Sequence, residues 1–491
     1  MEANVLVTAE TDAGEYEPIC IDLDGTFVKT DLMLEMLLKA AGQHWAVLLT
    51  APVWLTHGKA YFKQELAKRC TLDIAHLPFD EELRSYLKRQ RERGHRLVLA
   101  TAADRKIAEA IAAEAGIIDE VIASDGITNL KGETKARVLE DRFGNRGFIY
   151  VGNDRCDLPI WRKAKEAVVV NASSYVTRAA AAATTVRETF AARESSLVQL
   201  LKAMRTYQWA KNILVFIAPL TALVLWEPAI ALASLVIFFA FCATASGVYI
   251  INDLLDLDSD RQHPRKRYRP FASGKLPLQY GLYGPILVSI GIIFGSIVSS
   301  ECGLAIVTYA VLSIAYSVSL KKKPLIDVFV LASLYSLRLL TGGLATDVSV
   351  STWLLSFSSF LFLALAFLKR TAELAALRSE EKRKVSGRGY GASDLSMLKV
   401  MGVACSFVSS LVLALYIDST TARTIYANPN VLWGIVPLIL FWQCRLWLST
   451  ARGRMHDDPI VYAAKDRISW LIFGLIMVIF GIANLDGIPW G

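Results

Sequence analysis

The residues best suited to do chemistry lie in the stretch NDLLDLDSDRQHPRKRYRP, residues 252–270. Four aspartates fall within eight residues, and five lysines or arginines follow within nine. The almost wholly apolar run FFAFCATASGVYII stands directly before them. Mg²⁺ takes oxygen ligands from a few carboxylates and fills its remaining positions with water and substrate phosphates. Basic side chains bind phosphates through charge-assisted hydrogen bonds. The stretch therefore predicts a magnesium and phosphate site at the mouth of a membrane segment.

The spacing of the acids supports this interpretation. If the apolar helix continues, Asn252, Asp256 and Asp260 recur every fourth residue and share one face, with Asp253 beside them. Like charges at that spacing repel, and a divalent cation removes the conflict. The competing interpretation is a solvated charged loop, which is the usual meaning of an isolated DxxxD. The NDxxDxxxD spacing at a membrane mouth, followed by HPRKRYRP, favours the metal site.

The elements that precede this stretch form an α/β pattern. The runs YEPICIDLDG, HRLVLATAAD and RGFIYVGND are short, apolar and bounded by turn formers, and helical patterns follow them. They predict a parallel sheet with flanking helices. Residues 32–90 predict a mostly helical insertion between the first two strands. We expect this domain to span residues 1–180, with a linker at 181–204 that is rich in Ala, Ser and Thr.

From residue 205 to residue 491 the pattern is that of a membrane protein. The chain of 491 residues is 54% hydrophobic and 20% charged, which suits a soluble domain joined to a membrane domain. Tandem apolar runs predict nine transmembrane helices. They cover residues 212–226, 229–250, 282–299, 302–318, 325–345, 352–368, 398–417, 431–448 and 469–486.

The basic residues predict the orientation of these helices. If the helices alternate in direction, one set of loops carries twenty Lys or Arg and the other carries only Arg423. The positive-inside rule places the first set, and the N-terminal domain with it, in the cytoplasm. An odd number of helices then puts the C-terminus outside. The first residues lack the pattern of a signal peptide, which agrees with a cytoplasmic N-terminus at an inner membrane.

The front domain resembles the haloacid dehalogenase (HAD) phosphatases, a Rossmann-like α/β fold. The resemblance rests on DLDGT (22–26), ATAAD, LKGETKARVL and YVGNDRCDLP in that order, with residues 32–90 at the position of the cap. It implies that Asp22 attacks phosphorus and that Asp24 transfers protons. It further implies that Thr101 and Lys135 bind phosphate, and that Mg²⁺ is held by Asp22, Asp24 and Asp157. This sequence departs from the family pattern GDxxxD, because Asn153 stands in place of an acid.

The membrane domain resembles the UbiA superfamily of transferases, which have nine helices and place NDxxDxxxD opposite a second acidic motif. The resemblance implies Mg²⁺ on Asn252, Asp253, Asp256 and Asp260, with Asp256 and Asp260 essential for catalysis. In the second motif only Asp327 remains, since Leu331 stands where a second acid is common. Asp327 lies within an apolar segment, and this position favours a function for it, as a further metal ligand.

One branch of that superfamily, the decaprenyl-phosphate phosphoribosyltransferases, resembles this chain most. RTYQWAKN, RQHPRKRYRPFASG, LKRTAEL and SGRGY occur in order between residues 205 and 390. The branch moves 5-phosphoribose from phosphoribosyl diphosphate (PRPP) to a polyprenyl phosphate. Both substrates are rich in phosphate, so we expect basic and polar side chains to bind them. The candidates are Lys266, Arg267, Arg269, Lys321, Arg338, Lys369, Arg388 and Tyr390.

Two other functions compete with this one. The first is an ordinary UbiA prenyltransferase that acts on an aromatic or lipid acceptor, with a structural HAD domain. The second is a transporter with charges along its path, which is disfavoured because the charged motifs lie at loop ends on one side. The basic residues cluster at a membrane mouth and imply no nucleic-acid partner. The seven cysteines lack the spacing of a zinc site. No motif specifies the acceptor's chain length or the oligomeric state.

Joining the two resemblances predicts two consecutive reactions. The transferase product would still carry the 5-phosphate of PRPP, and a HAD phosphatase on the same chain could remove it. A tether raises the effective concentration of one site for the other's product. Residues 32–58 are apolar enough either to touch the bilayer or to form the core of the cap.

Overall fold

The structure is a computed structural model that describes residues 16–44, 46–125, 127–190, 194–378, 389–455 and 458–485. The chain divides into two compact units. The first contains Met1–Ala203 together with Asp253–Leu282, and the second contains Met204–Asn252 with Tyr283–Gly491. Residues 253–282, which the sequence places in the membrane domain, therefore pack with the N-terminal unit.

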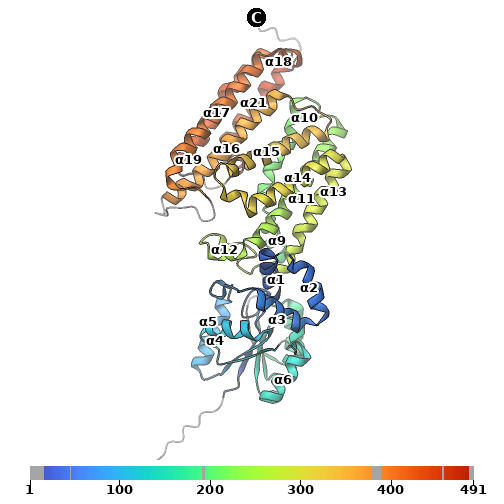
Figure 1. Ribbon diagram of the computed structural model, residues 1–491, viewed down its shortest axis with the longest axis vertical. Helices are drawn as coiled ribbons and strands as arrows, with labels where there is room; N and C mark the ends of the chain where they lie inside the picture. Colours follow the sequence, from blue (N-terminus) through green and yellow to red (C-terminus); the bar gives the residue numbers. More distant parts are fainter. Residues whose placement is uncertain are drawn as a thin grey trace, which may run out of the picture. The chain divides into compact units, whose positions relative to one another are not determined.

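The N-terminal unit is built on a six-stranded sheet in which every pair of neighbouring strands is parallel (Figure 1). The strand order is β3-β2-β1-β4-β5-β6. The strands are β1 (Ile19–Ile21), β2 (Leu97–Asp104), β3 (Glu120–Ser124), β4 (Ile149–Gly152), β5 (Glu166–Val169) and β6 (Thr185–Thr189). The three strands expected from the sequence are β1, β2 and β4, and the parallel sheet is confirmed. The order reverses at β1, and sites in such sheets lie at the carboxyl ends of the strands beside that point.

The region expected to be a linker contributes to this unit. The edge strand β6 pairs in parallel with β5 and lies within residues 181–204. Helix α8 (Ser174–Ala183) precedes β6, and α9 (Ser196–Ala203) follows it. An alanine-rich stretch gives little periodic signal, and for this reason the edge strand is not visible in the sequence pattern.

Alternating side chains of the strands fill two cores. In β1, Ile19 and Ile21 face one core and Cys20 faces the other, as the two-residue period of a strand requires. The first core contains residues of α4 (Glu81–Glu92) and α5 (Arg105–Ala115). The second contains residues of α6 (Glu133–Phe143), α7 (Leu158–Trp161) and α8. Both faces of the sheet are thus covered by helices.

The expected helical insertion is present and forms a cap. It consists of α1 (Leu32–Gln43), α2 (Val47–Thr56), α3 (Lys59–Arg69) and the short η1 (Ile74–His76). Asp31 caps α1 by accepting a hydrogen bond from the Leu34 amide. Residues 253–282 add α12 (Leu257–Gln262), η4 (Lys266–Tyr268) and η5 (Leu278–Leu282) to the same unit.

The second unit is a bundle of long apolar helices that run side by side (Figure 1). They are α11 (Pro228–Leu255), α13 (Tyr283–Val298), α14 (Ser300–Val318), α15 (Ile326–Ala345), α16 (Thr352–Arg378), α17 (Leu395–Asp418), α19 (Ile435–Ala451) and α21 (Arg467–Ala483). Small residues allow close approach between them. A Cβ on Gly291 of α13 would lie 2.6 Å from the Ala240 carbonyl oxygen of α11. Shorter helices α10 (Ile217–Thr221), α18 (Thr420–Ile425) and α20 (Pro459–Lys465) connect the bundle.

The number of spans is the main departure from expectation. Within the described residues, seven helices are long and apolar enough to cross a membrane. An eighth span results if the pair α20 and α21, bent by 86°, is counted as one. The prediction of nine is not confirmed, because residues 206–216 form a 3-10 helix, η3 (Thr206–Phe216), that continues into the short α10.

Candidate active sites

The HAD-type residues gather at the carboxyl edge of the sheet. Asp22 directly follows β1, Thr101 lies in β2, and the turn 153–157 follows β4. These three strands are neighbours in the sheet, so a single edge brings the three sequence motifs together. The expectation that DLDGT, ATAAD and YVGND form one site agrees with this placement.

Lys135 of α6 links the acids of this site. Its Nζ lies 2.6 Å from Asp22 Oδ1 and 3.1 Å from the Tyr150 hydroxyl oxygen. The Tyr150 hydroxyl in turn donates to Asp157 Oδ1 at 3.1 Å. Burial would lower the pKa of Lys135, but the carboxylates of Asp22 and Asp157 outweigh it and raise that pKa. The lysine therefore stays cationic beside the nucleophile candidate, where a phosphate oxygen would need a positive charge.

Asp24, the predicted proton-transfer residue, has a raised pKa. Burial, and next the charge of Asp31, raises the pKa of its carboxyl to about 7. A group with that pKa can be protonated and deprotonated near neutral pH, as a general acid and base requires. Its Oδ1 accepts a hydrogen bond from the Leu32 amide at 3.0 Å, which ties it to the first turn of the cap helix α1.

The cap contributes a lysine that sequence reasoning did not single out. Lys63 of α3 is buried and donates to the Ala102 carbonyl, next to Thr101, at 2.6 Å. Burial lowers its pKa, while the nearby carboxylates of Asp24 and Asp31 oppose that shift. Thr101 itself is buried, and its hydroxyl accepts from the Ala103 amide. No sequence motif marks Lys63, because it lies in a helix that is otherwise ordinary.

The turn after β4 is ordered by hydrogen bonds to Asp157, although Asn153 stands where the HAD pattern has an acid. Asp157 is buried and accepts hydrogen bonds from the backbone amides of Asn153 and Asp154 at 2.9 and 3.0 Å. Burial, and next the charge of Asp22, raises the pKa of Asp157 to about 6. Asp157 thus fixes the turn that presents the Asn153 side chain. The carboxylates of Asp22 and Asp157 with an amide oxygen from Asn153 are donors that Mg²⁺ accepts.

The acidic stretch adopts a different shape from a continuous helix. Helix α11 ends at Leu255, and Asp256 has φ −92° and ψ 9° before α12 begins. This kink brings Asp253 and Asp260 to one guanidinium group. The same Arg269 nitrogen lies 3.1 Å from Asp253 Oδ1 and 2.6 Å from Asp260 Oδ2. Two acids of the motif and one of the predicted bases therefore meet in the structure.

This acid pair suits a cation. The carboxylates of Asp253 and Asp260 converge on one positive group, and Asp260 Oδ1 is buried without a hydrogen-bond partner among the described residues. Asn252 Oδ1 is also buried without one in that part of the chain. Burial raises the pKa of Asp260, although Arg269 opposes the shift. Within the described ranges, no group of three or more His, Cys, Asp or Glu already has the arrangement of a metal site.

Of the other predicted bases, Lys266 lies near enough to Asp260 for its charge to counter burial, which raises the pKa of that carboxyl. Lys266 and Arg267 are exposed in η4, and Arg267 lies over the ring of the adjacent Tyr268. Lys321 lies half-buried in the short 3-10 helix η6 (Leu320–Lys322). Arg388 falls outside the described residues.

Asp327, the remaining acid of the second motif, is fully buried at the start of α15 and neutralised. Its carboxylate pairs with the Arg370 guanidinium of α16, and the Tyr390 hydroxyl donates to Asp327 Oδ1 at 2.6 Å. Arg370 also pairs with Glu373 at 2.6 Å. Burial and the bond to Asp327 raise the pKa of Tyr390. Asp327 is therefore held by Arg370 and Tyr390 in this structure, and its role as a metal ligand stays a prediction.

A buried cationic cluster occupies the interior of the second unit. Lys211 of η3 and Lys369 of α16 lie 2.8 and 3.0 Å from Asp458 Oδ2. The Tyr335 hydroxyl donates to the same carboxylate at 3.0 Å. Burial would raise the pKa of Asp458, but the two ammonium groups hold it well below its usual range.

Arg338 of α15 adds a third positive charge to this unit. It donates to the Asn212 amide oxygen at 2.7 Å and to the Tyr309 hydroxyl at 2.9 Å. Helix η3 reaches α15 at a glycine, since a Cβ on Gly342 would lie 2.0 Å from the Val215 carbonyl oxygen. We call Lys211, Lys369, Arg338 and Asp458 the cationic cluster. Three cations and one carboxylate leave two positive charges in a buried polar site, an arrangement that suits a phosphorylated substrate.

Lys211, Tyr335 and Asp458 were not among the predicted site residues. Lys211 lies within RTYQWAKN, one of the stretches that carry the resemblance, so the motif indicated the region without naming the side chain. Asp458 precedes Pro459, and Asp before Pro is a common helix start, which gives a structural reason for the residue and conceals its role. Its burial between two lysines is visible only in three dimensions.

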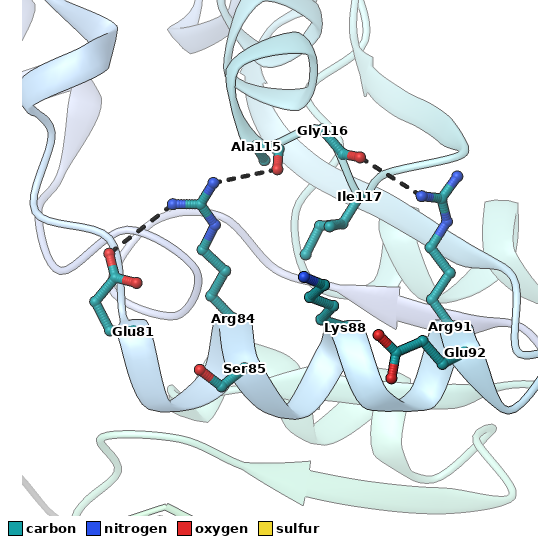
Figure 2. Close-up of a pocket in the computed structure, with 9 residues that line it drawn as sticks. All are labelled: Glu81, Arg84, Ser85, Lys88, Arg91, Glu92, Ala115, Gly116 and Ile117. Carbon is teal, nitrogen blue, oxygen red and sulfur yellow. Dashed lines mark hydrogen bonds and ion pairs between the residues drawn. The ribbon is translucent and has the colours of Figure 1, made fainter.

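A solvent-open hollow with a volume of about 650 Å³ lies elsewhere on the N-terminal unit, between α4 and the end of α5 (Figure 2). Arg84 and Arg91 span it and donate to the carbonyls of Ala115 and Gly116. The sheet edge that carries the HAD-type residues lies at the opposite end of the 11-residue helix α5, about 16 Å away. The hollow is therefore separate from the HAD-type residues.

Two protein families match this chain, and the UbiA match includes residues 253–282, which pack with the N-terminal unit. Residues 213–464 match the UbiA prenyltransferase family, and residues 19–162 match the haloacid dehalogenase-like hydrolases. An uncharacterised protein, y4nM of Sinorhizobium fredii, is 34% identical over 95% of this chain and 91% of its own. The decaprenyl-phosphate phosphoribosyltransferase of Mycolicibacterium smegmatis is 31% identical over 56% of this chain and 88% of its own.

A UbiA homologue from Archaeoglobus fulgidus, solved with GPP and Mg²⁺, is 15% identical over 58% of this chain and 99% of its own, with a TM-score of 0.46. The match to the UbiA model alone covers more than half of the chain. The protein is therefore a multi-span membrane enzyme of the UbiA prenyltransferase family that carries an N-terminal HAD-like domain.

Proposed function

We propose that the membrane unit transfers 5-phosphoribose from PRPP to a polyprenyl phosphate such as decaprenyl phosphate. The observation that carries the proposal is the electrostatics of the second unit. The one acid left in the second motif is neutralised by Arg370, while the cationic cluster retains two positive charges. PRPP carries a 5-phosphate in addition to its diphosphate, so it demands more cations than a prenyl diphosphate does. Two relatives that match a little over half of this chain are named decaprenyl-phosphate phosphoribosyltransferase, and these names support the choice of donor and acceptor.

The reaction breaks the bond between C1 of the ribose and the diphosphate, and forms a bond from C1 to an oxygen of the lipid phosphate. Asn252, Asp253, Asp256 and Asp260 would hold a divalent cation, which neutralises the diphosphate as it leaves. We assign Lys211, Lys369 and Arg338 to the substrate phosphates, where Arg can bind two oxygens at once. The chain's contribution is then mostly placement and charge compensation.

Transfer of a prenyl group is the alternative, and the family match itself supports it. The experiment that separates the two is incubation of the purified protein with Mg²⁺, decaprenyl phosphate and PRPP labelled in the ribose. We expect label to enter the lipid fraction with release of diphosphate. The proposal fails if the lipid stays unlabelled while a labelled prenyl diphosphate is consumed under the same conditions.

We further propose that the HAD-like domain removes the 5-phosphate from that product. Asp22 would attack phosphorus and form an aspartyl phosphate, while Asp24 protonates the departing 5-oxygen. Asp24 would then take a proton from water, which releases inorganic phosphate. The ion pair of Lys135 with Asp22 supports this assignment, as does the pKa of about 7 at Asp24.

The cap has a surface that suits a lipid-linked substrate. In α2, Val47, Ala51 and Trp54 face the core, whereas Leu49 and Val53 are 67% and 57% exposed. The helix contains no charged residue. An uncharged helix with an apolar outer face is typical of a membrane surface. In this proposal both sequence alternatives for residues 32–58 apply, because one side of α2 packs on the core of the cap and the other side is exposed.

Replacing both exposed residues, Leu49→Glu with Val53→Glu, is expected to slow phosphate release from the lipid-linked product about tenfold. Hydrolysis of water-soluble p-nitrophenyl phosphate should stay unchanged, since the catalytic edge is intact. The matched control is Ala110→Glu with Ala113→Glu on the exposed face of α5. Equal loss on both substrates would mean that α2 supports the cap and does not contact the bilayer.

We propose an inner-membrane location with the N-terminus in the cytoplasm and the C-terminus outside. The segment η3–α10 provides the ninth crossing in this proposal. Its 11 residues of 3-10 helix rise about 2.0 Å each and its 5 α-helical residues about 1.5 Å each, or about 30 Å if straight. Reporters fused before Met1 and after Gly491 should respond on opposite sides. Signals from one side only would mean an even number of crossings.

A further inference from the structure

The strongest unexplained feature is a buried ion pair between the cap and the acidic stretch. Glu35 of α1 and Arg261 of α12 are 226 residues apart in sequence and form two bonds, at 2.5 and 3.0 Å. Their side chains are 3% and 4% exposed. The Thr30 hydroxyl donates to Glu35 at 3.0 Å, and Arg261 Nε donates to the Ala272 carbonyl. A bidentate pair with further bonds on both partners is among the strongest polar contacts a protein makes.

This ion pair connects the stretch that carries the proposed transferase acids with the cap helix beside the HAD-type site. Arg261 directly follows Asp260, whose carboxylate binds Arg269. Glu35 lies in the first turn of α1, the turn whose Leu32 amide binds Asp24. Holding Arg261 therefore fixes the backbone beside Asp260. The same helix turn contacts the proton-transfer residue of the HAD-like site.

A second close contact, at Gly274, joins the segment that follows α12 to the residues before the cap. Gly274 has φ +70°, and a Cβ there would lie 2.5 Å from the Lys29 carbonyl oxygen. Only glycine lets the chain after Arg269 approach the residues between DLDGT and α1 so closely. Two weaker contacts also join the cap to α12. Lys39 pairs with Asp258, and Gln262 donates to Asp73.

From this geometry we infer that Glu35, a cap residue, is a positioning residue for the transferase reaction. It holds α12 through Arg261 so that Asp253, Asp256 and Asp260 are preorganised for the cation and the diphosphate. The HAD-like domain then positions the acidic stretch of the transferase and is more than a tethered second enzyme. This inference rests on the proposed transferase function.

The test compares Glu35→Gln with wild type in the full-length protein in nanodiscs. Glutamine keeps the shape but removes the charge that holds Arg261, so Asp260 should lose its fixed position. We expect the Mg²⁺ concentration for half-maximal transfer from PRPP to rise about tenfold, a loss of about 1.4 kcal/mol. The KM for decaprenyl phosphate should change little. The reversed pair, Glu35→Arg with Arg261→Glu, should restore most of the Mg²⁺ response.

Lys39→Gln is the matched control, since its pair with Asp258 joins the same two helices at a partly exposed position. Hydrogen exchange supplies a readout without turnover. Amides of residues 257–262 should exchange faster in Glu35→Gln, and those of β2 should not. Faster exchange with an unchanged Mg²⁺ response would overturn the inference, as would failure of the reversed pair to rescue a properly folded protein. If wild type ignores PRPP, the proposed function fails, and the exchange result still decides whether Glu35 orders α12.

Discussion

Purified Asp22→Asn protein is expected to convert PRPP and decaprenyl phosphate to the 5-phosphorylated lipid and to stop there. Asparagine lacks the carboxylate that attacks phosphorus, so phosphate release should fall by about three orders of magnitude or more. The first reaction should proceed at the wild-type rate, because the transferase acids lie in a different segment. The measurement is inorganic phosphate, separated from diphosphate, together with the mass of the lipid product.

The fold should survive this substitution. Lys135 loses the negative charge of its 2.6 Å partner but remains beside Tyr150 and near Asp157, whose carboxylate still faces its ammonium group. Asp141→Asn makes the same chemical change on the exposed side of α6 and should behave as wild type. If Asp22→Asn and wild type accumulate the same phosphorylated lipid, the HAD-like domain does not catalyse the second reaction. The substitution of Asn153 for an acid would then explain the lost activity.

Asp260→Ala is expected to abolish transfer from PRPP, with a loss of about a thousandfold. The reason is that a catalytic cation stabilises developing charge by several kcal/mol, and Asp260 is one of its proposed ligands. Asp256→Ala should behave likewise. Expression and thermal stability should change little, since Arg269 keeps its bond to Asp253. The variant also no longer has to bury the Asp260 carboxylate, which costs free energy of folding. The measurement is label transfer to lipid alongside a melting curve in detergent.

Asp258→Asn is the control for this substitution. Asp258 lies in the same stretch but outside the NDxxDxxxD positions, and it pairs with Lys39 at a partly exposed site. Its transfer rate should stay within about twofold of wild type. Wild-type transfer by both Asp256→Ala and Asp260→Ala would remove the acids from the metal site altogether.

Sequence reasoning succeeded where a pattern determines geometry directly. Short apolar runs followed by turn formers predicted β1, β2 and β4, and parallel pairing then forced Asp22, Thr101 and the turn at Asn153 to one edge. The long apolar runs predicted the membrane helices, because length and hydropathy alone make such a helix recognisable.

Other features depend on packing between distant residues and could not be predicted. The break at Asp256 redirects the acids from one helix face to a shared arginine. The apolar run 212–226 begins inside η3, where Asn212 binds Arg338 of α15 and the adjacent Lys211 pairs with Asp458, the residue before α20. The bond of Glu35 to Arg261 joins residues that no local pattern relates. In each case the partner lies too far along the chain for periodicity to reveal it.

In the proposed function, the membrane unit uses PRPP as its donor and a polyprenyl phosphate as its acceptor. The most direct test gives the purified wild-type protein Mg²⁺, decaprenyl phosphate and equal concentrations of PRPP and a prenyl diphosphate, and measures the mass of the lipid product. We expect a lipid that has gained a phosphoribosyl group and is converted over time to a ribosyl lipid that lacks the 5-phosphate. A prenylated product, with PRPP untouched, would contradict it.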